Sequence, residues 1–296
     1  MTSGCSIDLD DASETIRAPA GAELTMPEAD RDPDEADLDR MTTTVGSTGR
    51  IELADFFIDA IFFLDDTILR AKHHPECFAH IQSAEERLAP AGTLIVTSDL
   101  VGTPGGPPAP IVVNPDSHGE YAEFPGPMLF VVGEEINVQF YLEGAPGLPG
   151  VEEATLRSSA FPLINVTAPA VPDSGVLVVS STKPLRFAWD VPAAHSPDPV
   201  HSRDRQRVSI RLNPLSPVHW GSLYCSWPVS AGHGKVPAPL LREFRRQLGS
   251  TGPLDGNLDM VSGDFREITT PSSSYVAYTT TDFGLTFPRV LSVIFD

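Results

Sequence analysis

Short apolar runs alternate along the chain with clusters of proline, glycine and serine, and this pattern predicts a mainly β protein. Runs such as GTLIVTS (92–98), GVLVVSS (175–181) and RQRVSIRL (205–212) are too short for helices and rich in residues typical of strands. Many short strands separated by turn residues favour packed antiparallel β-sandwiches of the Ig-like kind.

A helical pattern is clear in one segment, PAPLLREFRRQL (237–248). Leu240, Leu241, Phe244 and Leu248 recur at helical spacing, a proline stands at the start, and Gly249 follows the last apolar residue. We therefore expect a single amphipathic helix here among the strands.

Three segments of the first half are less regular. RIELADFFIDAIFFLDD (50–66) fits an amphipathic helix or two strands, and its Phe and Ile content favours strands. PECFAHIQSAEERLA (75–89) predicts a short helix or an ordered loop. MLFVVGEEINVQFYLEG (128–144) predicts a hairpin, because apolar residues alternate along its second half.

The acidic start of the chain differs from everything that follows. Between Ser6 and Arg40 there are twelve acidic residues against three arginines, and no aromatic residue. Such a segment buries too little apolar surface to offset the entropy of ordering it. We expect a disordered acidic arm over 1–48, a first β-rich module over 49–170 and a second, Ig-like module over 171–296, divided at the turn-rich PAVPDS (169–174).

Charge and hydropathy argue against two classes of partner. The chain has 20 Lys and Arg against 40 Asp and Glu, a formal charge of −20, and no basic stripe that would bind nucleic acid. The most apolar stretch (55–64) is broken by Asp59 and falls short of the roughly 20 residues that span a bilayer. A membrane contact is expected only through an N-terminal lipid anchor.

The anchor hypothesis rests on Cys5. The opening MTSGCS is similar to the end of a bacterial lipoprotein signal, in which small residues precede a lipidated Cys. Thr2 replaces the usual Leu, and no apolar h-region precedes it. Either the start codon was placed late, or Cys5 is a thiol in a tail.

In SLYCSW (222–227), strand alternation places Leu223, Cys225 and Trp227 on one face and Tyr224 on the other. Cys225 is therefore expected to point into the core. A Cys225–His233 nucleophile pair would need an exposed sulfur and a group that orients the imidazole, and the sequence provides neither nearby. We predict no catalytic residues and no cofactor.

A candidate metal site lies in HHPECFAH (73–80). His73, His74, Cys77 and His80 bring four zinc-type ligands within eight residues. If a helix begins at Pro75, Cys77 and His80 share one face. The alternative is a polar, solvated loop.

The order of several segments resembles a group of uncharacterised bacterial secreted lipoproteins. These segments are AGTLIVTS (91–98), LFVVGEEINVQFYLEG (129–144), PLINVTAP (162–169), PLRFAWDVP (184–192) and LYCSWPVSAGHGKVPAPLL (223–241). The resemblance covers roughly 50–296 and implies a cell-envelope or extracellular β-sandwich protein. It departs from the group where paired cysteines precede the first strand, because only Cys77 stands there. In an oxidising compartment Cys77 and Cys225 would be free to pair, a possibility that the sequence leaves open.

Two functions follow. The first is a noncatalytic interaction, adhesion or scaffold module with an unknown protein or polysaccharide partner. The second is a carbohydrate-binding module or hydrolase accessory protein that uses exposed aromatic residues, with Tyr121 and Trp220 as candidates. Trp189 alternates with Phe187 and is expected in the core.

Overall fold

Long β-strands carry the fold in the computed structural model. It describes residues 41–82, 88–101, 109–125, 128–131, 136–157, 164–190, 206–270, 273–280 and 290–296. All of them belong to Asp34–Asp296, one of the two units into which the chain divides. Within these ranges, no helix is both long and apolar enough to cross a membrane.

The elements are as follows, in chain order. The strands are β1 (Met41–Ala54), β2 (Ile58–Ala71), β3 (Cys77–Ile81), β4 (Leu94–Ser98), β5 (Ile111–Val113), β6 (Tyr121–Glu123), β7 (Asn137–Leu142), β8 (Val151–Arg157), β9 (Val166–Ala168), β10 (Val176–Val179), β11 (Leu185–Trp189), β12 (Gln206–Pro214), β13 (Gly221–Pro228), β14 (His233–Val236), β15 (Leu254–Thr270), β16 (Ser273–Thr280) and β17 (Val290–Phe295). A 3₁₀ turn (Val229–Ala231) and the helix α1 (Ala238–Gln247) lie between β13 and β15.

The largest sheet closes on itself. Seven of its ten strands follow the order β15-β12-β13-β3-β2-β1-β16, and β16 pairs again with β15. The other three lie outside this ring: β17 pairs with β15, β10 with β17, and β6 with β2. Closure depends on the length of β15: its first part pairs with β12, and its second part, from Phe265, pairs with β16. A parallel pairing of β1 with β16, which sets Ser47 opposite Ser273, completes the ring. We call these seven strands the closed sheet.

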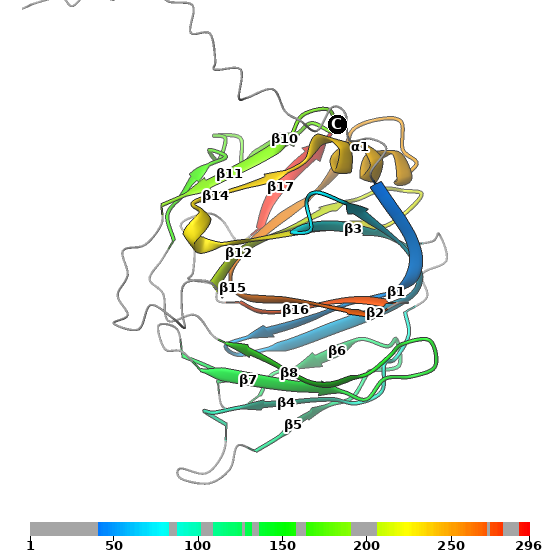
Figure 1. The fold of residues 1–296 in the computed structure, drawn as a ribbon, viewed down its shortest axis with the longest axis vertical. Coiled ribbons are helices and arrows are strands. Elements are labelled where there is room, and N and C mark those ends of the chain that lie inside the picture. The colour runs from blue at the N-terminus through cyan, green and yellow to red at the C-terminus, as the bar shows by residue number, and fades with distance from the viewer. Residues whose placement is uncertain are drawn as a thin grey trace, which may run out of the picture. The chain divides into compact units, whose positions relative to one another are not determined.

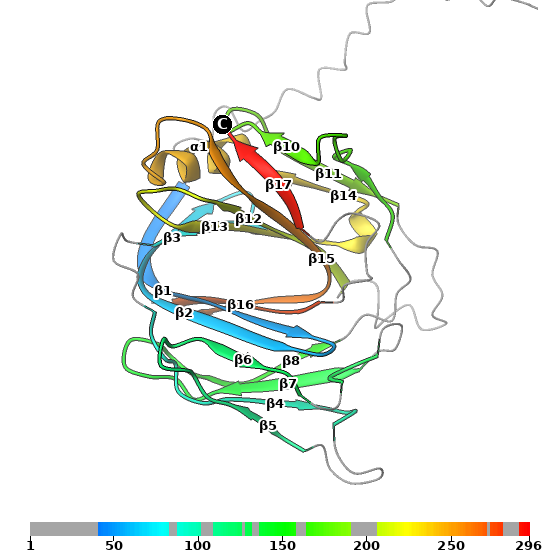
Figure 2. The ribbon, with the colours of Figure 1, turned by 180° about the vertical axis from the view of Figure 1, so that it is seen from behind.

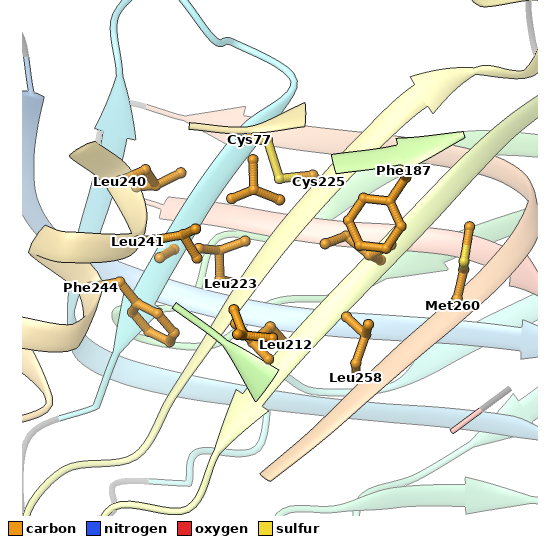
Figure 3. Close-up of a cluster of buried hydrophobic side chains, with 14 of the residues drawn as sticks. Cys77, Phe187, Leu212, Leu223, Cys225, Leu240, Leu241, Phe244, Leu258 and Met260 are labelled. Carbon is orange, nitrogen blue, oxygen red and sulfur yellow. A yellow bond between two sulfur atoms is a disulfide. The ribbon is translucent and has the colours of Figure 1, made fainter. Parts of the chain in front are cut away.

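Two hydrophobic cores cover the outside of the closed sheet. On one side, β3, β12 and β13 pack against α1 and the three-stranded sheet β14-β11-β9, and Figure 3 shows Leu240, Leu241 and Phe244 of α1 beside Leu223. On the other side, β1, β2 and β16 pack against the four-stranded sheet β5-β4-β7-β8 (Figures 1 and 2).

Residue alternation decides which side chains enter these cores. In β13, Leu223, Cys225 and Trp227 belong to the first outer core, as the sequence predicts. In β1, Ile51 and Leu53 belong to the second outer core. The intervening residues of each strand face the opposite way, into the space that the closed sheet surrounds.

The predicted helix is confirmed as α1, preceded by Pro237 and followed by Gly249. The glycines just before it have separate structural reasons. Gly232 adopts φ +69° after the 3₁₀ turn, a left-handed conformation that suits glycine. Gly234 lies against the ring of Trp227, where a Cβ would approach within 2.4 Å. Residues 233–236, between the 3₁₀ turn and the helix, form β14.

Several local predictions need correction. Residues 41–48, predicted as part of the disordered arm, belong to β1, and residues 1–40 lie outside the described part. Residues 77–81, predicted as helix or loop, form β3, buried throughout between β2 and β13. Of the hairpin predicted over 128–144, the described residues 128–131 form no strand, 137–142 form β7, and the hairpin partner of β7 is β8.

The mainly β fold is confirmed, whereas the division into two sandwiches at 170/171 is not. Strands from both sides of that boundary pair with one another, as β3 does with β13 and β1 with β16. The closed sheet therefore contains strands from both halves of the chain.

Candidate functional site

The interior of the closed sheet is lined by polar and charged side chains together with a small cluster of apolar and aromatic ones, in contrast to its apolar outer faces. Hydrogen bonds cross this space between strands that are not neighbours in the sheet. Arg70 of β2 donates to Glu267 of β15, with one N–O distance of 3.1 Å, although β1 and β16 separate these strands. Burying charged groups is costly unless they are paired, so charged side chains are unusual in the interior of a protein.

Arg211 on β12 is the central cation of the interior. Its Nε donates to Asp259 Oδ2 on β15 at 2.7 Å, and its Nη2 contacts the same oxygen. Asn213 Nδ2 donates to that oxygen at 3.3 Å, and the Oδ1 of Asn213 accepts from Ser222 Oγ at 2.6 Å. The network links β15, β12 and β13 and fixes the direction of each polar group.

A second network lies on the opposite wall, on β1, β2 and β16. Tyr278 donates its hydroxyl to Glu52 Oε2 at 3.1 Å. Glu52 lies 3.5 Å from Nη1 of Arg50, and Arg50 also contacts Asp59. Arg50 is thus flanked by two carboxylates.

Aromatic rings stack between these networks. Tyr224 lies between Phe78 and His80, with ring centroids 5.4 and 5.7 Å away and nearly parallel planes. His80 Nδ1 is 3.1 Å from Asp66 Oδ2, which also accepts from Thr48. Two rings of β3 therefore stack with Tyr224.

Burial and neighbouring charges set the ionisation of this interior. Burial raises the pKa of Tyr278 well above 10, and Glu52 beside it adds to the effect. Burial also raises the pKa of Tyr224, with Arg211 opposing. For Arg211 itself, burial acts to lower the pKa, but Tyr278, Tyr224 and Asp259 outweigh it and raise the pKa. Both hydroxyls therefore stay neutral, and Arg211 stays charged, across the physiological range.

Two adjoining cavities occupy the interior and share Arg211 and Tyr224. The larger cavity, of about 340 Å³, extends toward Phe265, Tyr278 and Val290. The smaller cavity, of about 260 Å³, extends toward the start of β13 and reaches Trp220. We call them the larger and the smaller cavity. Concave sites of this kind, with a few oriented polar groups, are typical of ligand binding.

The structure separates the four predicted metal ligands. Cys77 is bonded to Cys225 and is not available to a metal. His74 pairs with Glu76 at 3.1 Å, while His80 points into the interior toward Asp66. Among the described residues no three His, Cys, Asp or Glu side chains gather as a metal site. The predicted helix that would have aligned Cys77 with His80 is the strand β3, in which three-residue spacing sends side chains to opposite faces.

The disulfide joins neighbouring strands of the closed sheet. Cys77 of β3 stands directly opposite Cys225 of β13, with a Cα–Cα distance of 4.2 Å and a sequence separation of 148 residues. Figure 3 shows it within the first outer core, near Phe187 and Leu223. Bonded in this way, Cys225 has no thiolate for the rejected pairing with His233.

The two aromatic residues predicted to bind a ligand lie in different environments, one buried and one exposed. Tyr121 is fully buried in the second outer core, where its hydroxyl donates to Gly92 O at 2.6 Å and accepts from Ala91 N. Its prediction as a ligand contact is wrong. Trp220 is 62% exposed and lines the smaller cavity. Trp189, expected in the core, is buried there, and Cys5 lies outside the described residues.

Sequence reasoning missed the interior residues Arg211, Asp259, Glu52 and Tyr278. Their positions alternate with apolar residues, which is also the pattern of a strand with one solvated face. The sequence feature that points to them is the presence of both basic and acidic residues on the polar face of a long strand, as with Arg50 and Glu52.

Comparison with known proteins identifies no family. No protein-family model matches the chain, and no curated protein is similar to it in sequence. Among solved structures it is similar to the FN1–FN3 domains of chicken CNTN1, with a TM-score of 0.20 and 8% identity over 81% of this chain and 68% of that one.

Two further solved structures come from adhesion proteins. A tetra-tandem repeat from the extending region of a large adhesion protein has a TM-score of 0.19 and 12% identity, covering 81% of this chain and 50% of that one. A 1.5-MDa bacterial ice-binding adhesin has a TM-score of 0.15 and 6% identity, covering 83% and 65%. This chain thus spans only half the length of the first of these two. At such TM-scores the likeness carries no argument about fold or function.

Proposed function

We propose that this protein is a noncatalytic binding module of the cell envelope or extracellular space, and that the interior of the closed sheet is its ligand site. The carrying observation is the pair of adjoining cavities around Arg211 and Tyr224. A sheet with an apolar core on each outer side has no structural need for a charged interior, so the interior residues are retained for another purpose.

The ionisation of Tyr224, Tyr278 and Arg211, which line the cavities, favours binding over acid–base chemistry at these residues. A general acid or base works best with a pKa near the operating pH. The hydroxyls of Tyr224 and Tyr278 are moved away from that range, and Arg211 is held charged by its neighbours. Groups held in one ionisation state act as fixed donors and acceptors, which suits recognition of a ligand.

The disulfide supports the proposed compartment. Disulfides persist in oxidising environments such as the bacterial periplasm and the extracellular space, and are rare in the cytosol. The Cys77–Cys225 bond lies in the buried core of the fold, where it serves stability rather than reversible chemistry. An exported binding module is consistent with this placement.

The second candidate function, carbohydrate binding, needs a different geometry from the one the sequence predicts. A flat strip of exposed aromatic residues cannot include Tyr121 or Trp189, because both are buried. Trp220 at the smaller cavity is the observation that keeps this function open.

A thermal-shift experiment with a cavity-filling variant tests the binding site. The probes are a panel of neutral oligosaccharides, acidic oligosaccharides, amino acids and short peptides. A compound that binds the folded state raises the melting temperature of the wild type. The variant Val261→Phe narrows the larger cavity, and Val112→Phe on the exposed face of β5 is the matched control.

Stabilisation by a probe in the wild type and in Val112→Phe, but not in a folded Val261→Phe, supports the proposal. Equal stabilisation of all three proteins, or no stabilisation by any probe, contradicts it. Circular dichroism confirms that each variant retains its strands before the comparison is made.

A further inference from the structure

We infer that the smaller cavity is a subsite for a neutral saccharide, with Trp220 as the stacking platform at its mouth. This inference rests on the proposed binding function and names its ligand class. It depends on an exposed aromatic ring, two buried polar atoms that lack partners, and the local charge around Arg50.

Trp220 is placed as a sugar-stacking residue would be. It stands directly before β13, its side chain is 62% exposed, and it lines the same cavity as the interior residues Arg211 and Tyr224. Its backbone is fixed, because its carbonyl accepts from the amide of Gln82 at 2.8 Å. An exposed indole beside a polar cavity offers an apolar face to the C–H side of a pyranose ring and leaves the hydroxyls to polar groups.

Two side chains that line the cavity each have a buried polar atom with no hydrogen-bond partner among the described residues. They are the Oε1 of Gln82, an acceptor, and the Nε of Arg50, a donor. Gln82 as a whole is only 7% exposed. Native proteins rarely leave such atoms unpaired, because a buried polar group without a hydrogen bond is costly. A sugar hydroxyl both donates and accepts, so hydroxyls in the cavity would satisfy these atoms once the side chains of Gln82 and Arg50 turn them toward it.

The charges around this cavity favour a neutral ligand over an acidic one. Arg50 is flanked by Glu52 and Asp59, and Arg211 is paired with Asp259, so neither guanidinium has an uncompensated charge to offer a carboxylate. The whole chain carries −20, which repels polyanions. Hydrogen bonding without charge neutralisation is the mode by which neutral sugars are recognised.

The size of the cavity limits how much of a saccharide enters. At about 260 Å³ it lies just below the range of about 300–1,000 Å³ that is typical of drug-sized ligands. One sugar ring fits inside, and the next ring of a chain would lie over Trp220.

NMR spectroscopy of the three tryptophan indoles tests the inference, because Trp189 and Trp227 are buried and Trp220 is exposed. The probes are neutral trisaccharides of glucose, galactose, mannose and xylose, and trigalacturonate as the acidic counterpart. We expect one neutral trisaccharide to shift the indole signal of Trp220, which the variant Trp220→Phe identifies. Trigalacturonate is expected to leave that signal in place.

Three variants complete the test. Trp220→Ala and Gln82→Leu should each weaken binding of that trisaccharide by about tenfold or more, since they remove the platform or an acceptor. Phe124→Ala, at another exposed aromatic residue, should leave the affinity unchanged. Circular dichroism shows whether each variant is folded.

The outcomes separate this inference from the proposed function. Binding of another panel compound that Val261→Phe abolishes and Trp220→Ala does not affect contradicts the saccharide subsite and leaves the interior site in place. Preferential binding of trigalacturonate overturns the choice of a neutral ligand. Absence of any trisaccharide effect on the Trp220 signal overturns the inference as a whole.

Discussion

The two faces of the closed sheet are built from the same strands and have opposite character. In β13, Leu223 lies in an apolar core beside α1, whereas its neighbour Tyr224 lies in the polar interior between Phe78 and His80. In β1, Leu53 packs toward the four-stranded sheet, whereas Glu52 accepts from Tyr278. The outer faces carry the stability of the fold, and the interior carries the polar network and the cavities. Because one set of strands serves both purposes, the two can be altered separately.

The largest expected effect is loss of an outer core residue. Phe62 on β2 is fully buried and contacts Tyr121 and Tyr275 edge-on, with ring centroids 5.6 and 5.4 Å away. Phe62→Ala should lower the free energy of unfolding by about 3–5 kcal/mol, measured by chemical denaturation. A loss below about 1 kcal/mol would show that this face is not the source of stability.

Removal of the disulfide should follow closely. The double variant Cys77→Ala/Cys225→Ala removes a crosslink between residues 148 apart in the chain. It should lower the free energy of unfolding by about 2–4 kcal/mol. The measurement is urea denaturation of both proteins without reductant. Addition of dithiothreitol should then destabilise the wild type and leave the double variant unchanged. A wild type that is equally stable with and without reductant would contradict the account.

Breaking the interior ion pair should have a smaller effect that a second substitution reverses. Arg211→Met leaves the carboxylate of Asp259 without its guanidinium partner. The variant should lower the free energy of unfolding by about 2 kcal/mol, a value already reduced for the partial exposure of the pair. The double variant Arg211→Met/Asp259→Leu should regain most of the loss, since it removes both charges. If the double variant is less stable than the single one, the pair is a structural requirement and the contrast between the faces weakens.

The smallest effect is a dependence on pH at Asp59. Burial raises the pKa of this carboxyl to about 6, although Arg50 contacts it and favours the charged form. Between pH 4 and 6 the folded chain then binds the proton more tightly than the unfolded chain does. The contribution of Asp59 to stability therefore falls as pH rises through this window, by about 1 kcal/mol after allowance for the Arg50 contact and solvent screening. Asp59→Asn should remove that part of the slope in denaturation curves recorded from pH 4 to 7. An unchanged slope would contradict the assignment.

Local patterns in the sequence predicted the features of the fold that depend only on residues close together in the chain. Alternation assigned Leu223, Cys225 and Trp227 to one face, and helical spacing identified α1. Closure of the sheet depends on pairing between Ser47 and Ser273, which no local pattern encodes. Without closure, the polar face of each strand is indistinguishable from a solvated one, so Arg211 and Asp259 could not be recognised as a site. Of the predicted site residues, Trp220 and His80 line one of its cavities.

The five tyrosines of this chain allow the most direct test of the contrast between the two faces. Tyr224 and Tyr278 line the cavities of the interior, Tyr121 and Tyr275 lie in the second outer core, and Tyr141 is exposed on β7. Hydroxyl-radical footprinting of the native protein, read by mass spectrometry, reports the access of water to each ring. The account predicts fastest oxidation of Tyr141, intermediate oxidation of Tyr224 and Tyr278, and the slowest of Tyr121 and Tyr275. Equal protection of all four buried tyrosines would contradict a hydrated interior and, with it, the proposed ligand site.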